Sequence, residues 1–414
     1  MMKRRVVVTG LGELTPVGND VATTWQSLLA GKSGAAAITK FDASRFDVRF
    51  AAELKDFDAG LYMERKEAKR SDLYTQYAVA ASVQAMADAG LTEGSFDPET
   101  TGVIIGSGIG GLRTFEDQCE TYFKNGPGRI SPFFIPMFIG DIAAGVVSMR
   151  FQAKGPNYAV LSACATSSHA IGDAYRTIQY GDADIMIAGG AEAAVAPMAM
   201  GGFANMGALS NRNDSPETAS RPFDATRNGF VLGEGAGIVI LEELEHAIKR
   251  GAKIYGEVVG YASTGDAYTL TGQPEAHEGL QRSMRKALKD AKLEPTDVHY
   301  INAHGTSTPL NDPNESKAIK AVFGDHAFDL SVSSTKSATG HMLGAAGSVE
   351  FIACALAIRD GQVPPTINYQ VPDPECDLDY TPNVSRARQV DVAISNSSGF
   401  GGHNVTLALR RFVA

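Results

Sequence analysis

The sequence predicts an α/β fold built from two similar halves. Short apolar runs rich in β-branched residues recur and end in glycine or small polar residues. Continuous runs of this kind are typical of buried parallel strands. Helical stretches lie between them, and strands that alternate with helices define an α/β fold. One order of strand, small-residue loop and helix occurs twice, which favours an internal duplication.

The predicted elements follow one another in this order. In the first half, strands are expected over Arg5–Thr9, Gly102–Gly106, Tyr158–Ser162, Asp184–Ala188 and Ala236–Leu241, with helices over Ser71–Ala89, Ser168–Tyr180 and Leu241–Arg250. In the second half, strands are expected over Ile254–Gly260, Val298–Asn302, Leu330–Ser333, Val390–Ser395 and Val405–Leu409, with helices over Glu275–Ala291, Asn314–Phe323 and Val349–Ile358.

Matching loops indicate where the halves correspond. One strand ends near Ser162 and the helix after it ends near Gly181, while another strand ends near Ser333 and its helix ends near Gly361. No linker rich in proline, glycine and serine separates the halves, so we expect one shared core, with halves at residues 1–252 and 253–414. The alternative is that these similarities between the halves are no more than any α/β protein shows.

The composition excludes several classes of protein. The chain has 414 residues, of which 44% are hydrophobic and 20% charged, as in ordinary globular proteins. With 37 basic and 47 acidic residues the net charge is −10, which argues against general binding to nucleic acid or anionic membranes. The four cysteines form no CxxC pair, so we expect neither a disulfide framework nor a zinc site in a reduced, cytoplasmic protein. No run of 18 apolar residues occurs, so no membrane insertion is expected.

Cys164 is the strongest candidate for a catalytic nucleophile. It follows a predicted strand and stands among small residues at the start of a predicted helix. The positive end of the helix dipole is expected to lower the pKa of a thiol placed there, and a thiolate is a strong nucleophile. The alternative is a buried, inert cysteine, which is the usual state of a free cysteine in a protein.

Two histidines lie in similar loops of the second half. His304 follows the strand that ends at Asn302, and His341 closes the segment Lys336–His341. Open parallel sheets place their sites at such strand ends, and histidine can act there as acid, base or hydrogen-bond donor. Lys336 and Glu315 stand near these loops, where the alternative is a solvated salt bridge of little consequence.

Two glycine clusters stand near the predicted strand ends. Gly399–Gly402 surrounds Phe400, and glycine there permits a close backbone approach whose N–H groups could face a developing oxyanion. Gly106–Gly111 matches the dinucleotide-binding pattern only loosely and lacks a well-placed acidic partner, so we reject that interpretation.

Together these segments resemble the β-ketoacyl-acyl carrier protein synthases of type II fatty acid synthesis, most closely the synthase II branch, within the thiolase superfamily. The resemblance extends from Arg5 to Phe412 and rests on Ser162–Ser167, His304–Pro309, Lys336–His341 and Gly399–Gly402. It implies a five-layered αβαβα fold of two duplicated halves that forms a homodimer.

The resemblance also implies a decarboxylating condensation. Cys164 would carry the acyl chain as a thioester, and His304 and His341 would donate hydrogen bonds to malonyl-acyl carrier protein (malonyl-ACP) as carbon dioxide leaves. The backbone N–H groups of Cys164 and Phe400 would hold the oxyanion. A thioester is already activated, so no cofactor is expected beyond the phosphopantetheine of ACP, and no catalytic metal.

Further roles come from the resemblance alone. Lys336 and Glu315 would hold the histidines, and Phe400 would gate the acyl pocket. Substrate would contact Thr306, Thr308, Ile109, Phe134, Phe203 and Ser398, the last of which stands where relatives usually have phenylalanine. A structural monovalent cation would be held by Asn302, Glu350, Ser395 and Asn396.

ACP is acidic, so an enzyme of net charge −10 needs a local basic patch to bind it. The candidates are Arg65, Lys66, Lys69, Arg70, Lys124, Arg129 and Arg212. The alternative for the first four is a solvated helix face that also carries Glu64 and Glu67. Gly207 stands where many relatives carry a basic docking residue.

Three other functions compete with this interpretation. A ketosynthase of a type II polyketide or polyene pathway would use the same chemistry. A thiolase would need a second cysteine near the C-terminus, and none follows Cys376. A non-enzymatic partner subunit would lack the nucleophile, whereas Cys164 is present.

Overall fold

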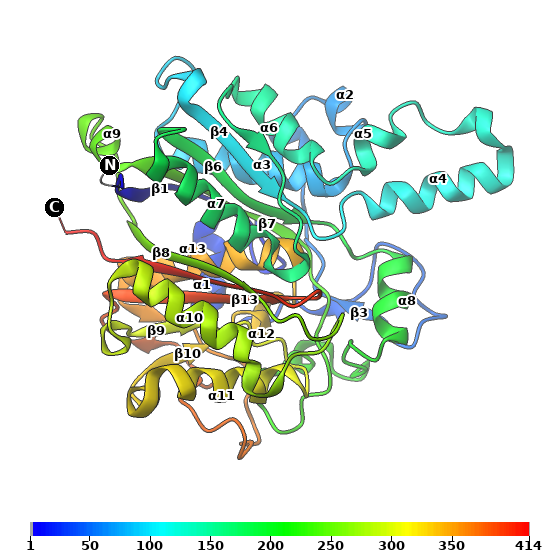
Figure 1. Cartoon of the computed structure of the whole chain (residues 1–414). Helices are drawn as coiled ribbons and strands as arrows, with labels where there is room; N and C mark the ends of the chain where they lie inside the picture. Colours follow the sequence, from blue (N-terminus) through cyan, green and yellow to red (C-terminus); the bar gives the residue numbers. More distant parts are fainter. Residues whose placement is uncertain (1–2, 414) are drawn as a thin grey trace.

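The computed structural model describes residues 3–413, and its strands repeat one spatial order twice (Figure 1). The full order is β10-β9-β13-β14-β8-β1-β7-β6-β4-β5. The bounds are β1 Val6–Leu14, β4 Thr101–Gly106, β5 Asn157–Tyr158, β6 Ile185–Glu192, β7 Gly235–Glu243, β8 Gly256–Gly265, β9 Tyr300–Asn302, β10 Ser331–Ser333, β13 Val392–Gly399 and β14 His403–Arg410. Numbered along the chain, the five strands of each half are arranged 3-2-4-5-1, and antiparallel pairing of β1 with β8 joins the two sets.

Helices complete five layers. We call the five strands of the first half the first sheet and those of the second half the second sheet. The outer face of the first sheet is covered by α3 (Leu73–Asp88) and α6 (Ile142–Phe151). The outer face of the second sheet is covered by α10 (Glu278–Ala291) and α11 (Asn311–Phe323). Between the sheets lie α7 (Thr166–Tyr180) and α13 (Ala346–Asp360) (Figure 1). The expected αβαβα fold and its internal duplication are confirmed, while the division between residues 252 and 253 stays a prediction.

Burial on both faces explains why the strands read as continuous apolar runs. In β4, Ile104 packs in the central layer with Ile171 of α7 and Phe351 of α13. Its neighbours Val103 and Ile105 point the other way and pack under α3 and α6. Side chains alternate along a strand, so a strand covered on both faces needs an apolar residue at every position.

The other helices and strands lie between these elements along the chain. They are α1 Val21–Leu29, β2 Ala36–Ala37, β3 Phe50–Ala51, α2 Arg65–Ala68, α4 Leu112–Asn125, α5 Phe134–Phe138, α8 Pro197–Asn205, α9 Leu244–Lys249, α12 Lys336–Thr339, β11 Gln362–Val363 and β12 Arg386–Ala387. Helices α4 and α5 form an arm that projects from the first half (Figure 1). Of the helices within residues 3–413, none combines the length and the apolar character needed to cross a bilayer.

Some predicted boundaries shift for local reasons. The strand expected over Tyr158–Ser162 is only Asn157–Tyr158, because the Ser162 N–H donates to Thr166 Oγ1 (2.9 Å) and the chain turns into α7. The helix expected from Glu275 begins at Glu278, because Ala276 and His277 have φ angles of 50° and 48°. Helix α3 begins after Asp72, whose carboxylate accepts from the Tyr74 N–H.

Candidate active site

Cys164, His304 and His341 line one pocket of about 290 Å³. Cys164 lies just before α7, His304 follows β9, and His341 follows α12. The rings of His304 and His341 are nearly perpendicular (86°), with centroids 5.5 Å apart. The fold therefore brings together the three side chains that the sequence singled out, across both halves of the molecule.

A tight turn presents Cys164 at the start of α7. Ala163 has a φ of 50°, and Thr166 Oγ1 donates to the Ala163 carbonyl at 2.8 Å. The Ser162 hydroxyl bonds Nδ1 of His169, whose Nε2 bonds Ser263 Oγ, both at 2.7 Å. These bonds tie the turn to α7 and to β8, so the position of the thiol is set by both halves.

The pKa of the Cys164 thiol is raised, to about 12, and the expected lowering by the helix end is wrong. Burial is the main cause, since the residue is only 9% exposed and the thiolate loses its hydration. The ammonium of Lys336 opposes this shift, whereas the carboxylates of Glu192 and Glu350 add to it. A thiol with this pKa would need a base to take its proton before it could act as a nucleophile.

His304 and His341 can supply that base. Both are buried, and burial holds the pKa of each imidazole well below 6.5, with the Lys336 ammonium lowering both further. Neutral rings can accept a proton from a thiol or donate one N–H to a developing oxyanion. Neither Nδ1 atom has a hydrogen-bond partner within residues 3–413.

Lys336 and Glu315 hold this site from behind. Lys336 is buried and forms an ion pair with Glu350, and burial raises the pKa of Glu350 to about 7. Glu315 accepts hydrogen bonds from the backbone N–H groups of His304 and Gly305, both at 2.8 Å. Glu315 thus fixes the loop that carries His304, not the imidazole itself.

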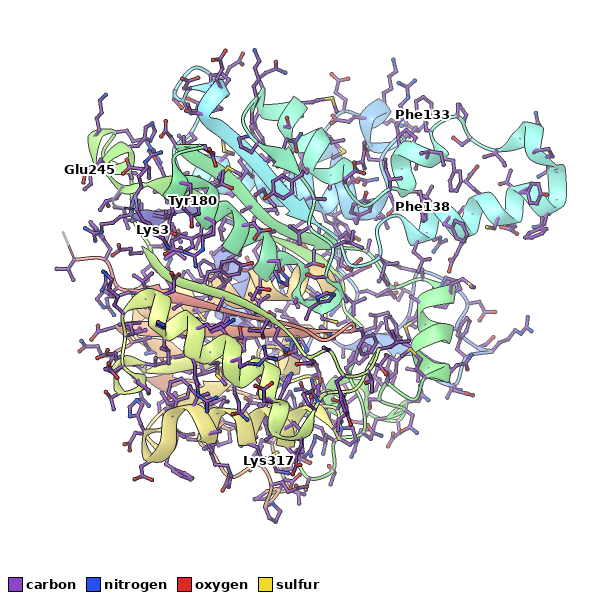
Figure 2. The ribbon with its side chains drawn as sticks, in the orientation of Figure 1. Lys3, Phe133, Phe138, Tyr180, Glu245 and Lys317 are labelled. Atoms are coloured by element: carbon purple, nitrogen blue, oxygen red, sulfur yellow. The ribbon has the colours of Figure 1, made fainter. Side chains whose placement is uncertain are left out.

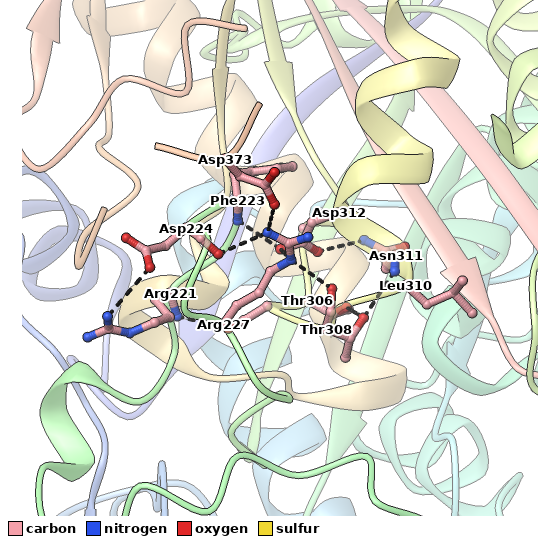
Figure 3. Close-up of polar contacts among 12 residues, drawn as sticks. Arg221, Phe223, Asp224, Arg227, Thr306, Thr308, Leu310, Asn311, Asp312 and Asp373 are labelled. Atoms are coloured by element: carbon pink, nitrogen blue, oxygen red, sulfur yellow. Dashed lines mark hydrogen bonds and ion pairs between the residues drawn. The ribbon is translucent and has the colours of Figure 1, made fainter. Parts of the chain in front are cut away.

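A buried charged network holds the next part of that loop (Figure 3). Arg227 forms an ion pair with Asp373 (2.6 Å) and donates to the Thr308 carbonyl (3.2 Å). Asp312 accepts from the Phe223 N–H at 2.8 Å. Thr306 and Thr308, whose hydroxyl groups are 3.0 Å apart, are thereby presented to the pocket.

Gly399 and Phe400 form the other wall beside the nucleophile. A Cβ atom on Gly399 would lie 2.5 Å from the Ser162 carbonyl oxygen and 3.2 Å from the Cys164 nitrogen. Only glycine allows this approach, which brings the segment carrying Phe400 against the Cys164 turn. Phe400 lines the pocket and is 36% exposed.

The other expected substrate contacts fall into two groups. Phe203 and Ser398 line the pocket, as do the two threonines. Ile109 does not line it but packs on the apolar cluster that contains Cys164 and Leu343. Phe134 lies on the projecting arm, where it packs on Phe138 with centroids 5.7 Å apart, so it does not reach the pocket of its own chain.

Three of the four residues predicted to hold a cation have free polar side-chain atoms within residues 3–413, and the fourth does not. Buried atoms without a hydrogen-bond partner in residues 3–413 include both amide atoms of Asn302, Oε2 of Glu350 and Oγ of Ser395. The Asn396 amide instead accepts from Thr406 Oγ1 at 2.9 Å, on the other face of β13. No cluster of three or more His, Cys, Asp or Glu suited to a metal occurs in the described part of the chain.

Six of the seven candidate basic residues are solvent-exposed. Arg65, Lys66, Lys69 and Arg70 lie on or just after α2, and the Arg70 guanidinium stacks over the Phe133 ring at 4.3 Å. On the arm, Arg129 is exposed and Lys124 forms an ion pair with Glu120. Arg212 is half-buried and donates to the Thr226 carbonyl.

Sequence reasoning missed two residues of the site. His277 is fully buried, lines the pocket and lies 3.4 Å from Ser398 Oγ, yet it sits in an ordinary polar segment. Glu192 ends β6 and binds two loops at the site. Its only signal is one acidic residue at the end of a small apolar strand.

A duplicated αβαβα fold with a buried cysteine facing two histidines defines a thiolase-like condensing enzyme. The profile for the N-terminal domain of β-ketoacyl synthases matches residues 3–247, and that for the C-terminal domain matches residues 255–370. The chain belongs to the β-ketoacyl synthase family.

Similar proteins and solved structures agree with this family assignment. The chain is 55% identical to the 3-oxoacyl-[acyl-carrier-protein] synthase 2 of Synechocystis sp. and 53% identical to that of Coxiella burnetii, each over 99% of both chains. A type II polyketide ketosynthase, solved with its acyl-carrier protein and bound to the hexaketide, is 38% identical with a TM-score of 0.92, over 99% of this chain and all of that one. A β-ketoacyl synthase from Burkholderia phymatum is 36% identical with the same TM-score and coverage.

Proposed function

We propose that the chain elongates fatty acyl chains by condensing an acyl group on Cys164 with malonyl-ACP. The convergence of Cys164, His304 and His341 in one pocket carries this proposal. The relatives at 53–55% identity are named 3-oxoacyl-[acyl-carrier-protein] synthase 2, and the polyketide ketosynthase is more distant at 38% identity. The chain is an acyltransferase, and a role in fatty acid synthesis is favoured over a polyketide pathway.

The first half-reaction transfers the acyl group. The Cys164 thiol gives its proton to a neutral imidazole of the pocket and attacks the thioester of acyl-ACP. The tetrahedral oxyanion accepts hydrogen bonds from the Cys164 and Phe400 N–H groups. Collapse breaks the bond to the pantetheine sulfur, which takes up the proton, and leaves the acyl group on Cys164.

The second half-reaction forms the carbon–carbon bond. His304 and His341 donate hydrogen bonds to the thioester carbonyl of malonyl-ACP, which stabilises the enolate formed as carbon dioxide leaves. The enolate carbon attacks the acyl carbon on Cys164. The Cys164 sulfur then departs and regains a proton, and the product is a β-ketoacyl-ACP two carbons longer.

The pocket walls fit the two parts of the substrate. Thr306 and Thr308 offer hydroxyl groups to the phosphopantetheine arm, which serves as the carrier in place of a free cofactor. Phe203 offers an apolar wall to the acyl chain, with Ile109 packed behind it and Phe400 as the gate. Ser398 also lines the pocket, and we expect this residue, which stands where relatives usually have phenylalanine, to change the preference for chain length.

ACP is the proposed protein partner. Arg65, Lys66, Lys69 and Arg70 offer an exposed basic surface, with Lys124 and Arg129 on the arm as further contacts. Charge reversal at Lys66 and Lys69 should raise KM for acyl-ACP several-fold and leave turnover of acyl-pantetheine unchanged. Equal loss with both substrates would contradict docking at this surface.

A homodimer in the cytoplasm is proposed as the working form. The edge strand β5 has an open side, and Tyr158 on this strand and Leu161 just after it are exposed. The arm, on which Figure 2 labels Phe133 and Phe138, also exposes Phe123 and Ile135. A second chain would cover these side chains, and Phe134 would contact the partner's acyl pocket.

A structural monovalent cation also fits the chain. Asn302, Glu350 and Ser395 present buried oxygen atoms without hydrogen-bond partners within residues 3–413, and oxygen is the ligand that hard cations prefer. Asn396 would take part through its carbonyl, because its side chain faces the other way. Such an ion would neutralise buried charge behind Lys336 and has no part in the reaction steps.

The decisive experiment supplies acyl-ACP and malonyl-ACP and follows carbon dioxide and β-ketoacyl-ACP. We expect equal amounts of both products from the wild-type chain. Wild-type protein that forms no condensed product, or a Cys164→Ala variant that still forms it, would refute the proposed mechanism. Polyketide starter units that react faster than fatty acyl groups would favour the other pathway.

A further inference from the structure

Glu192 is a fully buried carboxylate at the end of β6, and its four hydrogen-bond donors are all uncharged. Oε1 accepts from Ser107 Oγ (2.9 Å) and the Ile109 N–H (3.2 Å). Oε2 accepts from the N–H groups of Gly108 (2.7 Å) and Gly344 (2.9 Å). One carboxylate thus binds two loops that lie more than 200 residues apart in the chain.

The two loops are in direct contact around this carboxylate. A Cβ atom on Gly344 would lie 2.3 Å from the Gly108 nitrogen and 2.8 Å from Glu192 Oε2. A Cβ atom on Gly108 would lie 2.7 Å from the same oxygen and 3.5 Å from the Ala163 carbonyl oxygen. The space between the loops therefore admits no side chain except that of Glu192, and the nucleophile turn forms its third side.

Each loop carries a group of the active site. The loop of Gly108 carries Ile109, which packs on the apolar cluster that contains Cys164. The loop of Gly344 follows His341 by three residues and carries Leu343, which lines the pocket. Because Oε2 is shared by both loops, a movement of one changes the hydrogen bond to the other.

A second buried glutamate, Glu242, has a charged hydrogen-bond partner and serves as a comparison for Glu192. Glu242 lies on β7, next to β6, and is also fully buried. It is neutralised by two hydrogen bonds from the Arg250 guanidinium, both at 2.6 Å. Glu192 lacks such a cation among its bonds, and its charge raises the pKa of Cys164. The loops of the site, and not a cation, therefore hold Glu192 in place.

We infer that Glu192 is a positioning residue that couples the loop of Ile109 to the loop of His341. An acyl chain on Cys164 presses on the apolar cluster against which Ile109 packs and so moves the loop of Gly108, and the shared carboxylate passes this movement to Gly344. Loss of carbon dioxide from malonyl-ACP is then faster when Cys164 carries an acyl chain than when it is free. This inference rests on the proposed function.

The test measures carbon dioxide release from malonyl-ACP with Cys164 free and with Cys164 acylated, and the ratio of the two rates is the coupling. We expect the Glu192→Gln variant to lower this ratio about fivefold or more. The amide keeps the size of the side chain but turns an N–H₂ group toward backbone N–H donors, so one loop is released. Ser107→Ala removes only one of the four bonds and should lower the ratio less.

The Glu242→Gln variant is the matched control and should leave the coupling unchanged. A second readout needs no substrate: Glu192→Gln should speed alkylation of Cys164 by iodoacetamide, because a negative charge near the thiol is lost. Unchanged ratios in both Glu192→Gln and Ser107→Ala would overturn the inference, as would a wild-type ratio of one. In that last case wild-type condensation would still uphold the proposed function, whereas a wild-type chain that does not condense would refute the function instead.

Discussion

The two halves of the molecule use the same turn for different purposes. In the first half, Ala163–Ala165 precedes the 15-residue helix α7, and in the second, Leu343–Ala345 precedes the 15-residue helix α13. Both turns begin with a residue of positive φ, 50° at Ala163 and 44° at Leu343. Gly344 therefore occupies the position in the second half that Cys164 occupies in the first.

What faces the two turns differs. Gly399 faces the Cys164 turn and brings no side chain, so the backbone there borders the pocket. The carboxylate of Glu192 faces the Gly344 turn and accepts its N–H. The second turn thus holds an internal anion where the first would hold the oxyanion of the reaction. The backbone geometry is common to both halves, and the residues opposite the turn decide whether it is catalytic.

The largest expected effect comes from removing the Cys164 thiol, because the second turn has glycine at the equivalent position. Cys164→Ala should lower condensation by about 10⁴-fold or more, because no other thiol lines the described pocket. The free energy of unfolding should change by less than about 1 kcal/mol, since alanine fills nearly the same space. Product formation and chemical denaturation check the two parts. A large loss of stability would mean that the cysteine is structural.

Gly344→Ala tests the opposite expectation at the equivalent position. A Cβ atom there would meet the Gly108 nitrogen at 2.3 Å and Glu192 Oε2 at 2.8 Å, and neither atom can move freely. We expect a loss of about 4 kcal/mol in the free energy of unfolding, measured by urea denaturation. Gly207→Ala is the control for the loss of a glycine, because nothing lies within 4 Å of a Cβ atom there, although its φ of 68° adds some strain. Equal effects of the two substitutions would show that the Gly344 turn is not tightly packed.

The charge on Glu192 gives the second turn a pH dependence. Burial raises the pKa of Glu192 from 4.5 to about 7, so the folded state binds its proton more tightly than the unfolded state. Its contribution to the free energy of unfolding is full below pH 4.5 and is lost as the pH rises to 7, by up to about 3 kcal/mol. Glu192→Gln should abolish this contribution.

The free energy of unfolding of Glu192→Gln is compared with that of the wild type at each pH, which isolates the contribution of Glu192. His277, with a pKa lowered by burial to about 4, acts in the opposite direction, because its contribution is lost as the pH falls from 6.5 to 4. The neighbouring groups are the same in both proteins, so the difference between the two stability curves reports the carboxylate. A difference that stays constant from pH 4.5 to 7 would contradict the raised pKa.

The sequence predicts the layers and the three side chains that meet in the pocket, because both depend on local patterns. Continuous apolar runs indicate buried strands, and small residues around Cys164 indicate close approach. It does not predict the protonation of Cys164, because burial by distant segments outweighs the helix end. It also misses His277 and Glu192, whose roles depend on contacts with Ser398 and Gly344, each more than 100 residues away. Phe134 was expected in the pocket, but it lies on the projecting arm and packs on Phe138 instead.

The smallest expected effect comes from changing Ser398 and His277, which lie in contact at the pocket wall. Ser398 Oγ donates to Asn404 Oδ1 (2.9 Å) and lies 3.4 Å from His277 Nε2. A phenylalanine at position 398 would overlap the His277 ring, so Ser398→Phe alone should cost about 2 kcal/mol and lower activity.

His277→Gly should rescue that substitution. It removes the ring, and glycine suits the φ of 48° at this position better than histidine does. The double variant should regain most of the stability and favour shorter acyl chains than the wild type, because the aromatic ring narrows the wall. Urea denaturation and product lengths measure both effects, with Ser398→Ala as the control that adds no bulk. If the two substitutions simply add, with no recovery, the contact between Ser398 and His277 does not set the shape of the wall.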